Sequence, residues 1–542
     1  MSEAQTADAS LNRDERALLR VALDLGAAEV GGPLTEAEQR LADQARTPFQ
    51  LPAPSLQDTR DAILAGDDPL GTRLCEIRPP ARRRHQGAIY TPASLVGPML
   101  DWVLERNPDR LVDPGCGSGR FAAGAIRHRS DLPVVAVDLD PFATLLTRAN
   151  LGVLGARSAR VIQADYTTFD LPRITGRTAF VGNPPYVRHH DLSAGAKAWV
   201  VAAGRRLGYT VSTLAGLHVY FYLATALNAR PGDVGCFVTS AEWLDVNYGT
   251  IVRRLFVDGL GGQSLHLVNP RAVPFADAMT TAVIAGFVVG TPSERVHLRF
   301  VAAPSDLGDL NDGREVDRAR LGSVQRWTQM ITDRSRDDPG EPFVPLDKIA
   351  RVHRGIVTGA NDFFILTRES AGELGLLAWC RPAITHAEEI LRSNGLVRDG
   401  AERRLLLDVP ADVDRRAHPE LDEYLRRGEQ PRGDQPPISH RYITSHRRPW
   451  WFLGRTHPPP IVVSYMARQA PAFALNPDGL AIINIAHGIY PNEDLSAREL
   501  ASLTAILNRS RQSFRGSGRV YHGGLEKYEP REMEALRIPT PA

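Results

Sequence analysis

Residues 111–126 read LVDPGCGSGRFAAGAI, a short apolar run followed by a glycine-rich turn and a helical pattern. Glycine adopts backbone conformations that a side chain forbids, and it lets a ligand approach the main chain closely. Gly115, Gly117 and Gly119 therefore predict a strand–turn–helix unit whose turn faces a bound ligand. Because such units belong to parallel sheets covered by helices, this stretch predicts an α/β fold for the region around it.

Acidic residues end the strands predicted next to this turn. Asp138 closes VVAVDLD, a position that commonly binds ribose hydroxyls, whereas Asp113 before the glycines suits a cationic group better than a pyrophosphate. The following run ends in QADY, where Asp165 and Tyr166 would offer an adenine base a hydrogen bond and a flat face. Any one of these acids is more often a turn or cap residue, but three successive strand ends predict a cofactor site. On these residues alone, the cofactor could also be a nicotinamide dinucleotide.

The next predicted strand ends in TAFVGNPPY (178–186). Pro184 and Pro185 fix φ and make the loop rigid, and Pro184 biases Asn183 toward an extended conformation. The Asn183 side chain and the Pro184 carbonyl can then present two acceptors to one amine, with Tyr186 as a flat face beside it. This arrangement would prepare an exocyclic amine to attack a methyl group. The alternative is a proline turn in which the asparagine only satisfies local backbone.

The rest of the chain divides into three regions. Residues 1–80 are expected to be a helical N-terminal extension, 81–330 alternate strand-like and helical runs, and 331–542 are rich in proline and in arginine–aromatic clusters without that rhythm. With 542 residues and a net charge of +1, composition neither requires nor excludes nucleic acid. The four scattered cysteines show no metal-binding spacing and suit a reducing cytoplasm, and no apolar run is long enough to span a membrane.

Several motifs in a fixed order resemble the gamma class of adenine-N6 DNA methyltransferases of restriction–modification systems. They are GAIYTP (87–92), DPGCGSG (113–119), VDLDP (137–141), ADY (164–166), NPPY (183–186) and RAVPFADAMTTAVI (271–284). The resemblance continues into RVHRGIVTGANDFFIL (351–366) and VYHGGLEKYEPREMEALRIP (520–539). It implies a Rossmann-like S-adenosylmethionine-dependent methyltransferase domain over 81–330, with a mostly parallel seven-stranded sheet. A separate C-terminal mixed α/β target-recognition domain would follow over 331–542.

The resemblance also assigns roles to residues, with S-adenosyl-L-methionine as methyl donor and no metal. The cofactor residues would be Tyr90 and Thr91 near the methionine moiety, Asp113 with Gly115, Gly117 and Gly119 alongside it, Asp138 at the ribose, and Asp165 with Tyr166 at the adenine. The catalytic residues would be Asn183, Pro184 and Pro185 of the amine-binding loop, Tyr186 stacked on the target adenine, and Phe275 over its other face. The target base must then be flipped out of the duplex, at a cost of roughly a few kcal/mol.

The expected partner is double-stranded DNA, bound mainly by the C-terminal region. The candidate DNA-binding residues are Arg354, Thr358, Arg447, Arg448, Arg515, Arg519 and His522. None of the three lysines has an acid two residues before it, as the common nuclease motif requires. We therefore expect a monomeric, cytoplasmic, nucleoid-associated bacterial modification enzyme whose restriction endonuclease, or other defence-system subunits, are encoded separately.

Three alternatives stay open on the sequence. The first is a protein-glutamine methyltransferase, which would not need a second domain rich in arginine. The second is an RNA adenine methyltransferase, which the motifs alone do not separate from a DNA enzyme. The third is a non-catalytic DNA-binding subunit of a defence complex, against which the intact acidic and NPPY motifs argue.

Overall fold

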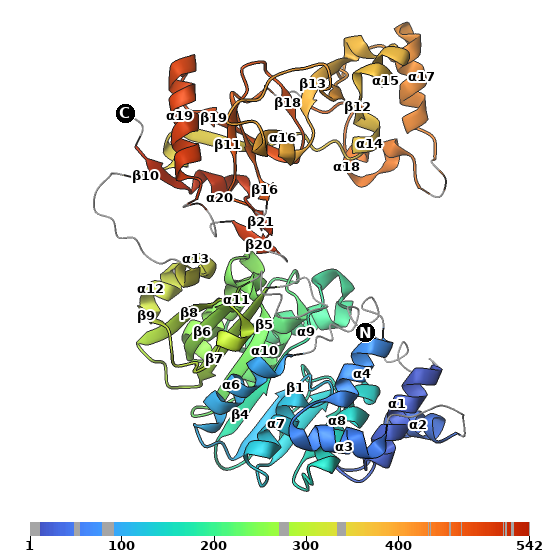
Figure 1. Cartoon of the computed structure of the whole chain (residues 1–542), viewed down its shortest axis with the longest axis vertical. Coiled ribbons are helices and arrows are strands. Elements are labelled where there is room, and N and C mark those ends of the chain that lie inside the picture. The colour runs from blue at the N-terminus through green and yellow to red at the C-terminus, as the bar shows by residue number, and fades with distance from the viewer. Residues whose placement is uncertain are drawn as a thin grey trace. The chain divides into compact units, whose positions relative to one another are not determined.

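The computed structural model describes residues 11–47, 55–78, 91–269, 281–332, 343–431, 433, 435–454, 457–467, 469–512, 514, 518–521 and 525–540. The chain forms two compact units, Met1–Asp333 and Arg334–Ala542 (Figure 1). We call them unit 1 and unit 2. Within the ranges given, no helix has the length and apolar character needed to cross a membrane.

Unit 1 is built on a nine-stranded sheet of order β3-β2-β1-β4-β5-β7-β6-β8-β9. The strands are β1 (Arg110–Pro114), β2 (Val134–Asp138), β3 (Arg160–Gln163), β4 (Thr178–Gly182), β5 (Val234–Ser240), β6 (Gly262–Val268), β7 (Ala282–Val288), β8 (Arg295–Val301) and β9 (Arg314–Asp317). From β3 to β5 every neighbouring pair is parallel, whereas β7 runs antiparallel to β5 and β6. The predicted mostly parallel α/β sheet is confirmed. The predicted number of seven strands is too small, because β8 and β9 extend the edge beyond β6.

Alternate strand residues pack on opposite faces of this sheet. Leu111 joins one apolar core together with α6 (Ala93–Leu104) and α7 (Arg120–His128). Its neighbour Val112 joins the other core, with α9 (Ala194–Arg206), α10 (Leu217–Asn228) and α11 (Thr250–Arg254). Because both faces are covered, β1 and β5 are buried along their whole length, as central strands of a covered sheet are.

The first helices of the chain pack against α8 (Pro141–Val153), the helix that follows β2 (Figure 1). They are α1 (Arg13–Asp24), α2 (Glu36–Arg46), α3 (Leu56–Ala65) and α4 (Pro69–Ile77). The contact is apolar, and it is crossed by an ion pair in which Arg148 Nε lies 2.9 Å from Glu38 Oε1, with both side chains at most 1% exposed. These residues are therefore an integral part of unit 1.

Unit 2 is a mixed α/β structure with two four-stranded sheets. The first has the order β11-β19-β15-β17 and the second β12-β14-β13-β18. Their strands are β11 (Ala350–Arg354), β12 (Ile365–Leu366), β13 (Cys380–Ile384), β14 (Leu405–Leu407), β15 (Ile461–Ser464), β17 (Phe473–Leu475), β18 (Ala481–Ile482) and β19 (Ala486–Pro491). The longer helices are α17 (Pro419–Gly428) and α19 (Ala497–Ser510), and smaller sheets pair β10 (Phe343–Pro345) with β22 (Arg537–Pro539) and β21 (Leu525–Lys527) with β16 (Met466–Ala467) and β20 (Arg519–Tyr521).

Candidate active site

The glycine loop between β1 and α7 has the conformation that its sequence predicts. Gly115, Gly117 and Gly119 have φ values of 71°, 58° and 84°, a region that favours glycine. A Cβ on Gly119 would lie 2.8 Å from the Thr147 methyl carbon, so this position tolerates no side chain. A Cβ on Gly117 would meet nothing within 4 Å, so here the main chain borders open space. The loop thus exposes backbone to a ligand at one glycine and packs closely at another.

Two carboxylates flank this loop. Asp138 at the end of β2 accepts the N–H of Gly117 on Oδ2 and that of Asp140 on Oδ1, both at 2.9 Å. Asp113 at the end of β1 is 1% exposed, and its Oδ2 accepts the Ala122 N–H at 3.1 Å. Its Oδ1 is buried without a hydrogen-bond partner among the described residues. Burial raises the pKa of Asp113 to about 8 and that of Asp138 to about 6.

The NPPY loop lies against the glycine loop. A Cβ on Gly182, the residue before Asn183, would be 3.2 Å from Asp113 Oδ1, and a Cβ on Gly115 would be 3.4 Å from Pro185 Cδ. Asn183 Nδ2 donates a hydrogen bond of 3.0 Å to Thr91 Oγ1, which fixes the orientation of the amide. The structure therefore brings together three strand ends that the sequence predicted separately, as expected for loops at the carboxyl edge of parallel strands.

The two residues predicted at the end of the third strand, Asp165 and Tyr166, lie in different environments. Asp165 is exposed and accepts the Thr167 N–H at 2.9 Å, so its carboxylate lies at the open edge. Tyr166 is 2% exposed, with its ring stacked on Phe221 at 5.2 Å and its hydroxyl 2.9 Å from Thr225 Oγ1. The structure places Tyr166 in the core and not beside an open adenine site. Because the Tyr166 ring packs on Phe221 of α10, the ring face predicted to contact the cofactor is covered.

Two predicted residues of this site, Tyr90 and Phe275, lie outside the described residues. Thr91, expected near the methionine moiety, is buried and contacts Asn183 instead through its hydroxyl. Tyr186 is half-buried, and burial together with Tyr222 raises its pKa well above the ordinary value. Its hydroxyl is therefore neutral at physiological pH.

The predicted DNA-binding residues of unit 2 have different environments. Arg354 is exposed and pairs with Glu529 at 2.5 Å. Thr358 is 1% exposed, and Arg447 donates to the backbone carbonyls of Val357 and Thr358. Thr358 and Arg447 thus hold their own loop together, while Arg448 donates to the carbonyls of two neighbouring residues. Arg515, His522 and the side chain of Arg519 lie outside the described residues.

A groove of about 520 Å³ in unit 2 contains Arg354, a predicted DNA-binding residue, together with basic and aromatic residues that the sequence interpretation missed. Arg351 and His353 share one face of β11, and Arg351 is paired in register with Tyr490 of β19. The His353 and Tyr490 rings lie 5.4 Å apart, and Arg354 and Arg381 also line the groove. The signal for these residues is the strand alternation in ARVHR, which becomes informative only once the strand is located.

Comparisons with known proteins agree with this geometry. The model of the family "Type II methyltransferase M.Eco57I, C-terminal domain" matches residues 335–542. The type II methyltransferase M.XamI of Xanthomonas campestris pv. amaranthicola is 41% identical over 478 residues, 87% of each chain. The type II methyltransferase M.AccI of Acinetobacter calcoaceticus is 20% identical over 473 residues, 83% of this chain and 85% of its own. Among solved structures, the type IIL restriction–modification enzyme MmeI in complex with DNA covers 95% of this chain and 78% of its own, with a TM-score of 0.55 at 13% identity.

Together with these relatives, the sheet and the paired glycine and NPPY loops place the chain among the S-adenosylmethionine-dependent methyltransferases. The match to M.XamI, at 41% identity over 87% of each chain, also identifies the family: the chain belongs to the methyltransferases of type II restriction–modification systems. It is thus a DNA methyltransferase of a modification system, and the S-adenosylmethionine cofactor predicted from the sequence is confirmed. A nicotinamide dinucleotide is excluded as the cofactor.

The residues present fit this cofactor. S-adenosylmethionine carries an ammonium and a sulfonium, and Asp113 offers a buried carboxylate oxygen without a partner among the described residues. Asp138 offers a half-buried carboxylate at the end of β2, where a ribose hydroxyl could be bound. Gly117, whose N–H binds Asp138, borders open space. Asp113, the glycine loop and Asp138 would therefore hold the cofactor.

Proposed function

We propose that this protein methylates the exocyclic N6 amine of an adenine that is flipped out of duplex DNA, at one short recognition sequence. The observation that supports this most directly is the position of Asn183 at the end of β4, in a proline-fixed loop that touches the glycine loop through Pro185. An amide oxygen and a neighbouring backbone carbonyl suit an amine with two hydrogens. Cytosine N4 also carries such an amine, and the resemblance of the motif order to the adenine-specific gamma class favours adenine.

The residues of the loop would act by binding and orientation. S-adenosylmethionine, when bound, supplies a methyl group activated by its positive sulfur. Asn183 Oδ1 and the Pro184 carbonyl would accept the two amine hydrogens, which directs the nitrogen lone pair away from the base ring. Thr91 holds the amide in the required orientation through the 3.0 Å bond to Nδ2. Tyr186 would stack on the base, and Phe275 would cover the opposite face.

Unit 2 would recognise the DNA, with the groove lined by residues of β11 and β19 as a contact surface. Arg351 and His353 are exposed, and arginine forks suit phosphates and guanine edges. Stacking of the flipped base on Tyr186 would return on the order of 1–3 kcal/mol of the cost of flipping. The contacts in the groove would have to supply the rest. In this proposal residues 81–330 form the catalytic domain, 331–542 the target-recognition domain, and the restriction endonuclease is a separate chain.

Single-molecule sequencing of genomic DNA from cells that express the chain tests this proposal. We expect methyladenine at one short motif, lost in Asn183→Ala and retained in the control Asn247→Ala, whose side chain is exposed. Asn183→Ala should leave cofactor binding largely intact. Methylcytosine in place of methyladenine, or labelled methyl groups in ribosomal RNA and not in DNA, would overturn the proposed substrate.

A further inference from the structure

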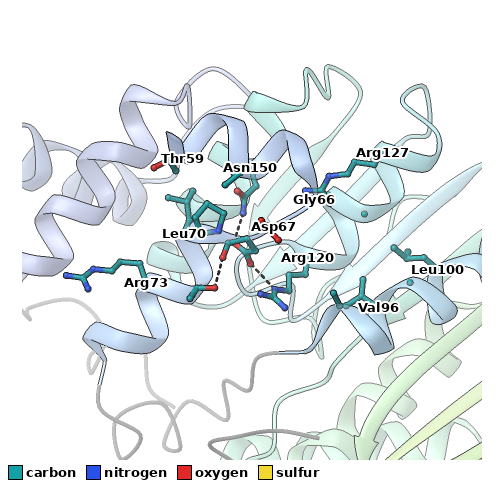
Figure 2. Close-up of a pocket in the computed structure, with 18 of the residues that line it drawn as sticks. Thr59, Gly66, Asp67, Leu70, Arg73, Val96, Leu100, Arg120, Arg127 and Asn150 are labelled. Carbon is teal, nitrogen blue, oxygen red and sulfur yellow. Dashed lines mark hydrogen bonds and ion pairs between the residues drawn. The ribbon is translucent and has the colours of Figure 1, made fainter. Parts of the chain in front are cut away.

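One cavity of unit 1 lies between the N-terminal helices and the methyltransferase fold. It measures about 650 Å³ and is lined from α3, α4, α6 and α7, among other elements. Figure 2 shows Asn150 and Arg120 directed toward the same point in its wall. The acceptor at that point is Asp68, the N-cap residue of α4, which is 8% exposed. A carboxylate buried to this extent requires several donors.

Asp68 receives donors from two distinct regions of the fold. Its Oδ1 accepts the Gly71 N–H at 2.9 Å, which caps α4, and Asn150 Nδ2 at 3.2 Å. Its Oδ2 accepts Ser118 Oγ at 2.5 Å and Arg120 Nε at 3.2 Å. Ser118 lies between two glycines of the glycine loop that have positive φ. One side chain from the N-terminal region thus contacts the glycine loop directly.

A second path leads from Asp68 toward the NPPY loop. Arg120, held by Asp68, donates from Nη1 to the Thr91 carbonyl at 2.5 Å. The hydroxyl of the same threonine accepts the 3.0 Å bond from Asn183 Nδ2. The carboxylate of Asp68 is therefore connected to the amide of Asn183 through two intervening residues, both of them in unit 1.

We propose that Asp68 is a positioning residue that holds the glycine loop in its cofactor-binding conformation and, through Arg120, orients Asn183. The first part concerns cofactor binding alone, and the second rests on the role proposed for Asn183. Glycines in left-handed conformations have many alternatives available in a free loop, so fixing them requires contacts from outside the loop. Asp68 supplies such a contact at Ser118, and Asn150 adds another by donating to the Ser118 carbonyl at 2.9 Å.

Three variants separate the two paths. Asp68→Asn keeps an oxygen for the α4 cap and loses the charge that holds Arg120. Ser118→Ala removes only the path to the glycine loop, and Arg120→Gln removes only the path to Thr91. Thr72→Val is the matched control, because its hydroxyl lies in the same cavity but donates to the Asp68 backbone carbonyl at 2.9 Å.

The measurements are the Kd of S-adenosylmethionine by titration calorimetry, the melting temperature without cofactor, and kcat on duplex DNA at saturating cofactor. Loss of a charge-assisted hydrogen bond should weaken cofactor binding about tenfold in Asp68→Asn and severalfold in Ser118→Ala. Arg120→Gln should lower kcat about tenfold with a smaller change in Kd, because small displacements of a reacting group slow catalysis strongly. Thr72→Val should change Kd and kcat by less than about twofold.

The proposal is overturned if folded Asp68→Asn binds the cofactor with unchanged Kd. It is also overturned if all four variants lose melting temperature and cofactor affinity in parallel, since that pattern indicates a purely structural role. If Asp68→Asn does not fold, the other two variants decide the question: Ser118→Ala should mainly change Kd, and Arg120→Gln should mainly change kcat. Because the Kd does not involve DNA, failure of the proposed substrate would appear in kcat alone and would leave the cofactor result interpretable.

Discussion

Binding of S-adenosylmethionine at neutral pH should release close to one proton from Asp113. This carboxyl is buried at the end of β1, and burial together with the charge of Asp138 raises its pKa to about 8. At pH 7 about nine in ten protein molecules therefore carry a neutral Asp113. A cationic ligand favours the ionised form, so the proton must leave when the cofactor binds.

The expected number of protons follows from this pKa. At pH 7 we expect about 0.9 protons released from Asp113 for each cofactor bound, and about 0.5 at pH 8. Asp138, with a pKa of about 6, adds about 0.1 at pH 7. Because the free protein binds more protons than the complex, affinity for the cofactor rises with pH, by about tenfold per pH unit near pH 7.

Calorimetric titrations at pH 7 in buffers of different ionisation enthalpy measure this number directly. The apparent binding enthalpy should vary with buffer at a slope of about one proton in the native protein. The slope should fall to about 0.1 in Asp113→Asn, where only Asp138 still titrates. Asp165→Asn is the matched control, because its carboxylate is exposed at the same edge of the sheet and the slope should persist. An enthalpy independent of buffer in the native protein, or an equal slope in Asp113→Asn, would refute the role given to Asp113.

Three further outcomes follow from packing and charge. Glu38→Gln leaves its buried arginine partner uncompensated and should lower the free energy of unfolding by about 3–5 kcal/mol in a denaturant titration, whereas Arg20→Gln in an exposed pair should change it little. Gly119→Ala should abolish cofactor binding in equilibrium dialysis because its Cβ has no room in the protein, while Gly117→Ala, whose Cβ meets no protein atom, should retain weaker binding. Arg351→Ala should weaken DNA binding and reduce the slope of log affinity against log salt concentration by about one. An unchanged slope would show that Arg351 does not contact the DNA backbone.

The cofactor half of the site could be predicted because each of its motifs determines its own local structure. Glycines that require positive φ mark the turn after β1, and acids at strand ends mark the edge at which a ligand binds. Asp113 and Asp138 are placed as expected on either side of the turn. The strand count was less predictable, because β8 reads RVHLRFV, whose mixed polar and apolar residues carry no motif.

Side-chain direction beyond the motifs could not be predicted. Tyr166 follows the same strand end as Asp165 but turns into the core, where Phe221 and Thr225 complete its contacts. In unit 2, Arg447 belongs to an arginine cluster that suits DNA, yet its guanidinium donates to carbonyls of its own unit. An arginine can bind either DNA or the backbone carbonyls of its own domain, and only the position of nearby carbonyls decides between the two.

The N-terminal helices show why a region without motifs can still be necessary for the site. On the sheet alone, α8 would expose the apolar side chains with which it now meets α1 and α4, among them Phe142 and Leu145. Each large side chain left exposed costs about 1.5–3 kcal/mol, against a total stability of about 5–15 kcal/mol for a domain. The same helices bring Asp68 to the glycine loop from 50 residues away in the chain. Covering α8 and fixing the cofactor loop are therefore two consequences of one packing arrangement, so this segment cannot be regarded as an appendage to the catalytic fold.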